Sequence, residues 1–381
     1  MLCLKNRIAF TILFALIAGC THKPPVVYDR TALSSESPAA QNSNVSYETN
    51  DYSASEPVDA LGFEALIRML AQEAEVNWGD SKSAGRTEYV KYSNGYRTRV
   101  MVDFEKGRVH VETLDKSDLN HAIVMTLLTP DDPGRVDLFS DTEVVLGKEP
   151  ILYGQVLDNN GQPIRWQWRA KSYADYLIQD RLTQRNTSKG MVYAVDFELV
   201  KNHESKRLYQ YAGIVRAHSQ KYRIDESLIY AIMRTESSFN PFAVSWANAY
   251  GLMQVVPSTA GRDVFQRIKK RRGQPSRKYL FQPWNNIDAG TAYLHILDNT
   301  YLKDIRDPLS RRYAIISAYN GGAGNVLKTF DRNRKKAIQK INDLQPSQVY
   351  WALTKRHPRQ ESRRYLEKVT KAEKDFHQGK I

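Results

Sequence analysis

The spacing of apolar residues changes near residue 200 of this 381-residue chain. Up to Leu199, short stretches alternate apolar and polar residues, as half-buried strands do. From Arg207 onward, apolar residues recur at helical spacing, and Gly and Pro punctuate the pattern. The sequence therefore predicts an α+β domain at 59–200 and an all-α domain at 201–381. The expected helices of the second domain are 207–221, 225–236, 257–270, 285–301, 308–318, 323–330, 346–354 and 360–376.

The α+β domain is expected to combine helices with a small sheet. An Asn94-Gly95 pair lies between two β-prone runs, 89–92 and 96–104, which is typical of a tight hairpin. No residues of this region form a catalytic constellation, so we interpret it as a binding or spacer module. The remaining predicted elements are a helix at 58–76, a strand with Val109 and Val111, a helix at 121–128, strand character at 151–168 and a last strand at 192–199.

Charge is distributed unevenly between the two halves. Residues 1–200 contain 21 Lys and Arg against 27 Asp and Glu, a net charge of −6. Residues 201–381 contain 34 against 15, a net charge of +19. A field of this sign attracts an anionic partner, such as a nucleic acid, an anionic membrane surface or an acidic polymer.

The first twenty residues, MLCLKNRIAFTILFALIAGC, narrow that choice. Lys5 and Arg7 precede an uncharged run from Ile8 to Gly19, which is shorter than the roughly 20 residues that span a bilayer. We interpret residues 1–19 as a signal peptide. The end of the run resembles a bacterial lipoprotein box, in which Cys20 becomes the lipidated first residue. The alternative is an apolar run before a chance cysteine, and the polar stretch that follows argues against a core helix.

Cysteine usage supports an exported, anchored chain. Cys3 and Cys20 are the two cysteines, so removal of the signal leaves one Cys and no disulfide. Residues 20–58 are rich in Ser, Pro, Asn, Ala and Thr and are predicted to be a flexible tether. The residue after Cys20 is Thr21 and not an aspartate, which in lipoproteins of this kind resembles sorting to the outer membrane. The chain is therefore expected at the outer membrane, facing the periplasm. Export excludes nucleic acid as a partner, and the acidic polymer of that compartment is peptidoglycan.

Glu236 is the strongest catalytic candidate. In the predicted helix 225–236, Ile229, Ile232, Met233 and Glu236 occur at i, i+3, i+4 and i+7, so the carboxylate shares the apolar face. Desolvation there favours the neutral acid, and a carboxyl with a raised pKa is a proton donor near neutral pH. The alternative is a glutamate at a helix end that pairs with an arginine.

Three further stretches accompany this glutamate. They are GLMQ at 251–254, AYNGG at 318–322 and ESRRYLEKV at 361–369. Taken singly, GLMQ fits a loop that packs on a core, AYNGG fits a common helix end, and a helical tyrosine is more often part of a core than of a site.

In this order, ESSFNP at 236–241 and the other three stretches resemble the four motif blocks of the lytic transglycosylases with a goose-lysozyme-like fold. The resemblance spans 207–376. It implies an all-α, lysozyme-like (goose-type, transglycosylase SLT) catalytic domain. It also implies cleavage of the β-1,4 bond between MurNAc and GlcNAc with formation of a 1,6-anhydromuramyl end, in cell-wall remodelling and turnover.

The resemblance also implies roles for single residues. Glu236 would be the catalytic acid/base, and the substrate-binding residues would be Ser237, Ser245, Met253, Gln254, Tyr319, Asn320 and Tyr365. The sequence departs from the family at Ala247, where relatives often carry a second serine. This departure weakens the case for a pair of serines at 245 and 247. It does not weaken the prediction that Glu236 is catalytic.

One carboxylate suffices if the substrate itself supplies the nucleophile and stabilises the positive charge. Glycosidases ordinarily use two carboxylates. In the family, the muramyl N-acetyl group stabilises the charge that develops at C1, and the C6 hydroxyl of the same sugar attacks C1. This attack within one sugar has an intramolecular advantage. Asp263 or Asp288 could still fold back on the cleft as a second acid.

Two other functions stay open from the sequence. A lysozyme-like hydrolase on the same fold would deliver water, and a second acid across the cleft would favour it. A non-catalytic lipoprotein would only bind the wall. The basic run 267–278 fits a solvated loop somewhat better than a substrate-holding segment.

No cofactor or metal site is expected. The eight His residues show no ligand-like pairing, and no glycine loop follows a strand in the manner of a phosphate site. The expected partners are peptidoglycan glycan strands and, through the lipid anchor, the outer membrane. Other cell-wall enzymes are further candidate partners.

Overall fold

A computed structural model describes residues 60–380, with side chains from residue 64 onward. These residues belong to one unit, Asp51–Ile381. The predicted signal peptide at 1–19, the lipidated Cys20 and the tether at 20–58 lie outside the described residues. No helix among the described residues is long and apolar enough to cross a membrane.

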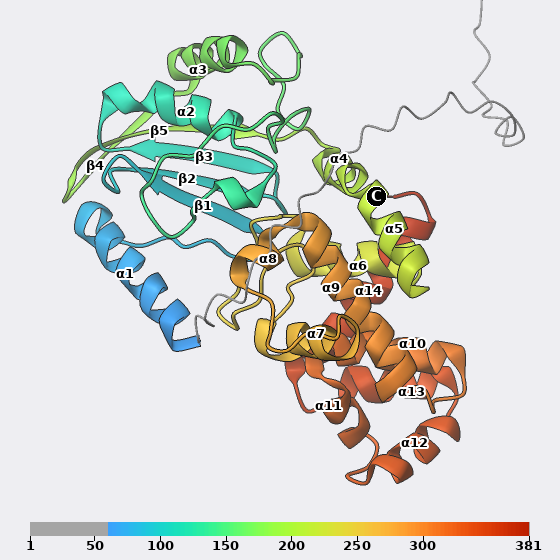
Figure 1. The fold of residues 1–381 in the computed structure, drawn as a ribbon. Coiled ribbons are helices and arrows are strands. Elements are labelled where there is room, and N and C mark those ends of the chain that lie inside the picture. The colour runs from blue at the N-terminus through green and yellow to red at the C-terminus, as the bar shows by residue number, and fades with distance from the viewer. Residues whose placement is uncertain (1–59, 381) are drawn as a thin grey trace, which may run out of the picture. The chain divides into compact units, whose positions relative to one another are not determined.

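A five-stranded antiparallel sheet organises the first part of the chain (Figure 1). Its strand order is β1-β2-β3-β5-β4. Val100 pairs with Val111, and Val111 pairs with Val195, so one apolar row crosses three strands. The strands are β1 (Glu88–Ser93), β2 (Thr98–Asp103), β3 (Arg108–Thr113), β4 (Thr183–Thr187) and β5 (Gly190–Glu198).

Helices cover both faces of this sheet (Figure 1). Helix α1 (Ala60–Trp78) packs Leu70, Ala74 and Trp78 on one face. Helices α2 (Leu119–Leu127) and α3 (Gln167–Arg181) pack on the other, where the apolar row lies. Two short 3-10 turns, η1 (Lys116–Asp118) and η2 (Pro133–Arg135), belong to the same region.

The predicted hairpin at Asn94-Gly95, the helices near 58–76 and 121–128 and the strand near 192–199 are confirmed. The predicted strand character at 151–168 is wrong. Residues 151–166 form turns and isolated bridges, and helix α3 begins at Gln167. The sequence also did not predict β4, because this edge strand is polar and four of its five residues are exposed.

Helices build the second part of the chain, as predicted. Helix α6 (Glu226–Ser237) lies at its centre, with Ile229, Ile232 and Met233 fully buried, and it packs against α14. The other elements are α4 (His203–Gln210), α5 (Ala212–Tyr222), η3 (Pro257–Gly261), α7 (Arg262–Arg267), α8 (Arg277–Phe281), α9 (Pro283–Ile296), η4 (Leu297–Tyr301), α10 (Pro308–Gly321), α11 (Ala323–Lys328), α12 (Arg334–Asn342), α13 (Pro346–Lys355) and α14 (Gln360–His377).

The helix boundaries differ from the prediction in three places. The predicted helix 207–221 is divided at Tyr211, and 257–270 begins with the π-helical turn η3. The helix predicted at 285–301 starts at Pro283 and ends in the π-helical turn η4. Helices α8 and α12 were not predicted, because α8 is one turn long and α12 buries only Ala337 and Ile341.

Arg207 joins the two parts of the chain. It is fully buried, and its guanidinium donates to the Phe104 carbonyl (2.7 Å), the Gln155 side-chain oxygen (2.5 Å) and the Ser238 carbonyl (3.2 Å). Because a buried cation needs partners for its N–H groups, these bonds tie the sheet, the 151–166 turns and the end of α6 together.

Candidate active site

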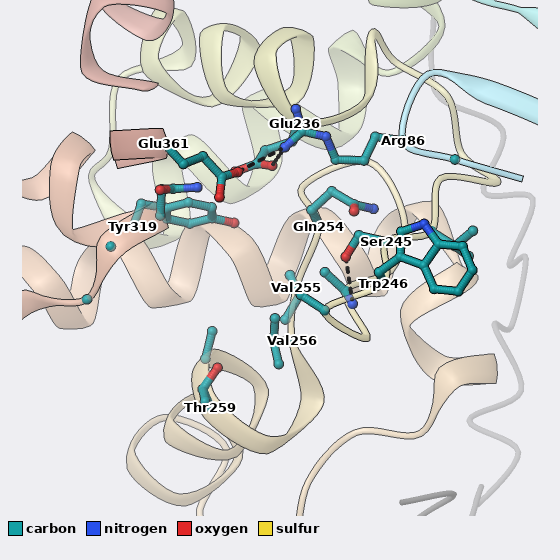
Figure 2. A pocket seen from close by; sticks show the side chains of 18 of the residues that line it. Arg86, Glu236, Ser245, Trp246, Gln254, Val255, Val256, Thr259, Tyr319 and Glu361 are labelled. Atoms are coloured by element: carbon teal, nitrogen blue, oxygen red, sulfur yellow. Dashed lines mark hydrogen bonds and ion pairs between the residues drawn. The ribbon is translucent and has the colours of Figure 1, made fainter. Parts of the chain in front are cut away.

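A cleft of about 800 Å³ opens beside the C-terminal end of α6 (Figure 2). Five of the predicted site residues line it: Glu236, Ser245, Gln254, Tyr319 and Asn320. The α+β region contributes to its wall through Ile67 and the segment 83–86. The structure thus brings together residues that are more than 200 positions apart in the sequence.

Glu236 occupies the last turn of α6. Its side chain is 7% exposed, and the apolar residues one and two turns earlier are fully buried, as the helical spacing predicted. The chain then turns sharply, with Ser238 and Phe239 in the left-handed region (φ 49° and 60°). The carboxyl therefore projects into the cleft from a rigid, packed element.

Burial raises the pKa of Glu236 from its ordinary 4.5 to about 7. The Arg86 guanidinium and the Tyr365 hydroxyl act in the opposite direction, and the Glu361 carboxylate adds to the increase. A carboxyl with such a pKa holds a proton at neutral pH and can both release and regain it.

Two tyrosines flank the carboxyl. Tyr319 donates its hydroxyl to the Met253 carbonyl (2.9 Å), and Tyr365 lies buried against Glu236. Burial raises the pKa of both phenols well above the usual range, so both stay protonated. The Tyr365 hydroxyl has no partner at ordinary hydrogen-bond geometry among residues 64–380, which leaves it available to the ionised form of Glu236.

Arg86 and Glu361 also line the cleft, and no pattern in the sequence predicted either residue. Arg86 Nη1 lies 3.7 Å from Glu236 Oε2 and 3.7 Å from Glu361 Oε1, so it bridges two carboxyl groups (Figure 2). Glu361 is the first residue of the ESRRYLEKV stretch, for which the resemblance implies a role of Tyr365 alone. Arg86 comes from the region that we interpreted as a binding or spacer module, so that region also contributes a charged side chain to the cleft.

The GLMQ turn presents Gln254 to the cleft. Gly251 has φ +73°, and a side chain there would collide with the Asn286 amide and with the Leu280 carbonyl at 2.7 Å. Asn286 holds the turn, since it accepts from Met253 N (2.8 Å) and donates to the Tyr250 carbonyl (2.7 Å). The Gln254 side-chain oxygen is buried without a partner among the described residues, so it can accept a hydrogen bond from a ligand in the cleft.

Ser245 and Trp246 form another wall of the cleft (Figure 2). The Ser245 hydroxyl accepts from Ala249 N (3.3 Å) and so closes the turn that carries both side chains. Trp246 is 77% exposed, so its ring faces the open side of the cleft. Ala247 also lines the cleft.

Asn320 is oriented by its neighbours. Its side-chain oxygen accepts from the Ser362 hydroxyl (2.6 Å), so its amide NH2 is left for a ligand. Gly322 ends α10 with φ +82°, which accounts for the second glycine of AYNGG, and a side chain at Gly321 would collide with Ser362 and His357.

Ser237 and Met253 do not line the cleft, contrary to the expectation that they bind substrate. Both are fully buried. The Ser237 hydroxyl bonds to the Met233 carbonyl (2.9 Å) and the Leu252 carbonyl (2.8 Å), so it holds the GLMQ turn against α6. Tyr365 is likewise absent from the cleft surface and reaches the site only through Glu236.

Neither Asp263 nor Asp288 is the second acid that the sequence left open. Asp263 accepts from Tyr301, and Asp288 is buried among Lys221, Lys269 and Tyr222. Neither lines the cleft, whereas Glu361 does. Among the residues with described side chains, no group of three or more His, Cys, Asp or Glu could hold a metal ion.

Two family models match the chain. The N-terminal domain of membrane-bound lytic murein transglycosylase C matches residues 56–210, and the transglycosylase SLT domain matches 213–342. A membrane-bound lytic murein transglycosylase C from Photorhabdus laumondii is 55% identical over 84% of this chain and 91% of its own length. This chain belongs to the membrane-bound lytic murein transglycosylase C family.

Two further proteins are similar to this chain. The relative of the same name from Yersinia enterocolitica is 52% identical over 84% of this chain and 90% of its own length. The 70 kDa soluble lytic transglycosylase of Escherichia coli is similar over 44% of this chain and 24% of its own, with 25% identity and a TM-score of 0.34. The predicted α+β region followed by a helical SLT domain is confirmed. The boundary at 200/201 stays a prediction.

Proposed function

We propose that this chain is a murein-degrading lytic transglycosylase in which Glu236 is the single acid/base. The observation that carries the proposal is a carboxyl with a pKa of about 7, buried at the end of a packed helix and open to a large cleft. The substrate class follows from the family and from the net charge of +19 in residues 201–381, which attracts the carboxylates of peptidoglycan stems.

In the first step, neutral Glu236 donates its proton to the oxygen that links MurNAc C1 to GlcNAc C4. The C1–O bond breaks, GlcNAc leaves with a free hydroxyl, and positive charge develops at C1. The N-acetyl oxygen of the same muramyl residue stabilises this charge. The Tyr365 hydroxyl stabilises the carboxylate that Glu236 becomes.

In the second step, the C6 hydroxyl of the muramyl residue attacks C1 and its proton returns to Glu236. The product is a 1,6-anhydromuramyl end, and no water is consumed. Since the nucleophile belongs to the sugar, the protein needs neither a second carboxylate nor a positioned water.

Three cleft groups suit a substrate with acetamido and hydroxyl groups. The unpartnered Gln254 oxygen can accept an amide N–H, the Asn320 NH2 can donate to a carbonyl, and the Trp246 ring offers a face to a sugar. Ser245 and Tyr319 complete the wall. Ser237 and Met253 act beneath it, by holding the GLMQ turn.

Hydrolysis by water is the second candidate, because Glu361 gives the cleft a second carboxylate. Both acids lie 3.7 Å from one Arg86 nitrogen, so the two carboxyl groups face the same part of the cleft. The ion pair with Arg86 and the 69% exposure of Glu361 favour a charge-balancing role over that of a base.

The test is digestion of purified peptidoglycan with the chain from Thr21 onward, followed by mass spectrometry of the released muropeptides. We expect anhydro ends, lighter by one water than reducing ends, and a loss of product of about 10³-fold in Glu236→Gln. Reducing ends that depend on Glu361 would establish the hydrolase instead. Absence of both products would leave a wall-binding protein.

We also propose that Cys20 carries the lipid that anchors the chain to the outer membrane, facing the periplasm. Support comes from the sequence MLCLKNRIAFTILFALIAGCT and from the words "membrane-bound" in the names of the relatives. Cys20→Ala should abolish labelling by radioactive palmitate and release the chain from outer-membrane fractions. An unchanged distribution would refute the anchor.

A further inference from the structure

Arg86 reaches the cleft from the α+β region, between α1 and β1. The helical region holds the backbone on either side of it: Val244 N donates to the Gly85 carbonyl (3.2 Å), and the Asn240 amide donates to the Arg86 carbonyl (3.2 Å). Both donors lie in the 238–250 loop that follows helix α6. The backbone that carries Arg86 is therefore attached to the loop that follows the catalytic helix.

The Arg86 guanidinium has no hydrogen bond of ordinary length to either acid. A distance of 3.7 Å to Glu236 Oε2 exceeds the usual range for a charge-assisted bond, which is about 2.7–2.9 Å. A carboxyl that is neutral attracts a cation weakly, whereas a carboxylate attracts it strongly. The side chain is 37% exposed, so it has room to approach Glu236 when the proton leaves.

The charges around Glu236 come from three directions. Arg86 contributes the positive charge, and Glu361 on α14 contributes a negative one. Tyr365 on α14 offers a hydroxyl, and Tyr319 on α10 has its hydroxyl committed to the Met253 carbonyl. Among these groups, Arg86 and Glu361 are the charged pair, and they have opposite effects on Glu236.

We propose that Arg86 is a positioning residue of the reaction: the α+β region supplies the cation that stabilises ionised Glu236, and Glu361 limits its effect by competing for the same guanidinium. This inference rests on the proposed role of Glu236 as acid/base. It makes the α+β region a working part of the catalytic centre and not only a spacer. The pKa of Glu236 supports it, since Arg86 lowers that pKa and Glu361 raises it.

The experiment measures kcat/KM against pH for the wild type, Arg86→Gln, Arg86→Lys and Glu361→Gln, all in the chain from Thr21 onward. The alkaline limb reports loss of the proton from Glu236. We expect this limb to move up by about 1 pH unit in Arg86→Gln and down by a smaller amount in Glu361→Gln. Arg86→Lys keeps the positive charge, so its alkaline limb should return most of the way to the wild-type position. Arg97 is an exposed arginine of the same region, and Arg97→Gln should leave the profile unchanged.

Titration of Glu236 by carbon-13 NMR of its side-chain carboxyl gives the same shifts without turnover. If Glu236→Gln retains activity, the proposed function fails, whereas the titration still tests the influence of Arg86. Profiles and titrations of Arg86→Gln that coincide with the wild type, with only a uniform drop in rate, would overturn the inference. If Arg86→Gln does not fold, the other two variants carry the test. A lower pKa of Glu236 in Glu361→Gln, together with a wild-type pKa in Arg86→Lys, would support the inference. An unchanged pKa of Glu236 in Glu361→Gln would contradict it.

Discussion

Glu236 and Asp288 are both buried carboxyl groups of the helical region, yet their environments are opposite. The Glu236 side chain is 7% exposed, and burial raises its pKa to about 7. The Asp288 side chain is 4% exposed, and its pKa is lowered, because its partners outweigh desolvation. Asp288 accepts from Lys221 (2.7 Å), Lys269 and the Tyr222 hydroxyl (2.7 Å), and His218 lies 3.3 Å away.

The difference shows that burial alone does not decide the protonation of a carboxyl. Asp288 receives short hydrogen bonds from cations, whereas the cation near Glu236 stays at 3.7 Å and is shared with Glu361. A donor at hydrogen-bond distance stabilises the anion strongly, and a distant, shared one does so weakly. The first arrangement stabilises the fold, and the second leaves a carboxyl able to exchange its proton.

The largest expected effect on stability comes from Asp288→Asn. Removing the carboxylate leaves Lys221 and Lys269 without their partner, which should lower the free energy of unfolding by about 3 kcal/mol, with activity retained in the folded fraction. The loss should shrink as the pH falls below the ordinary value of 3.8, because the pKa of Asp288 is lowered in the folded chain. Urea unfolding measures both effects.

The matched control is Asp298→Asn, which breaks the more exposed ion pair with Arg311 and should cost less than about 1 kcal/mol. Equal losses in the two variants would show that the bonds to Asp288 are no stronger than a surface pair.

Glu236→Gln should change the pH dependence of stability in the opposite direction. Folded Glu236 keeps its proton up to about pH 7, whereas the unfolded chain releases it above 4.5, so wild-type stability falls between these values. Because Gln does not titrate, the free energy of unfolding of the variant does not fall in this way. The advantage of the variant over the wild type should therefore grow by about 3 kcal/mol from pH 4.5 to pH 7. Parallel stability curves would exclude a raised pKa.

Tyr365→Phe should have the smallest effect of the three. It removes the hydroxyl that faces Glu236, so the carboxylate loses a stabilising donor and kcat should fall about tenfold. The alkaline limb of the pH profile should move upward, since Tyr365 lowers the pKa of Glu236. Tyr313→Phe on α10, where the ring packs on Tyr350, is the control and should leave both quantities unchanged. Equal values of kcat in the two variants would show that the Tyr365 hydroxyl does not contribute to the reaction.

Local patterns in the sequence predicted much of this protein. The i, i+3, i+4, i+7 spacing placed Glu236 on the buried face of its helix, because helical geometry depends only on near neighbours. The Asn94-Gly95 turn predicted its hairpin for the same reason. The prediction failed at 151–168, where β-prone residues have no neighbouring strand to pair with and the chain instead forms turns.

The sequence by itself determined which carboxyl is buried at a helix end and which motif blocks accompany it. Only the tertiary structure decided that Arg86 and Glu361 meet at that carboxyl and that Asp263 and Asp288 do not. The protonation of Glu236 depends on charges within a few ångströms, and these come from segments 150 and 125 positions away. Such contacts arise from packing between distant elements, for which local spacing carries no signal.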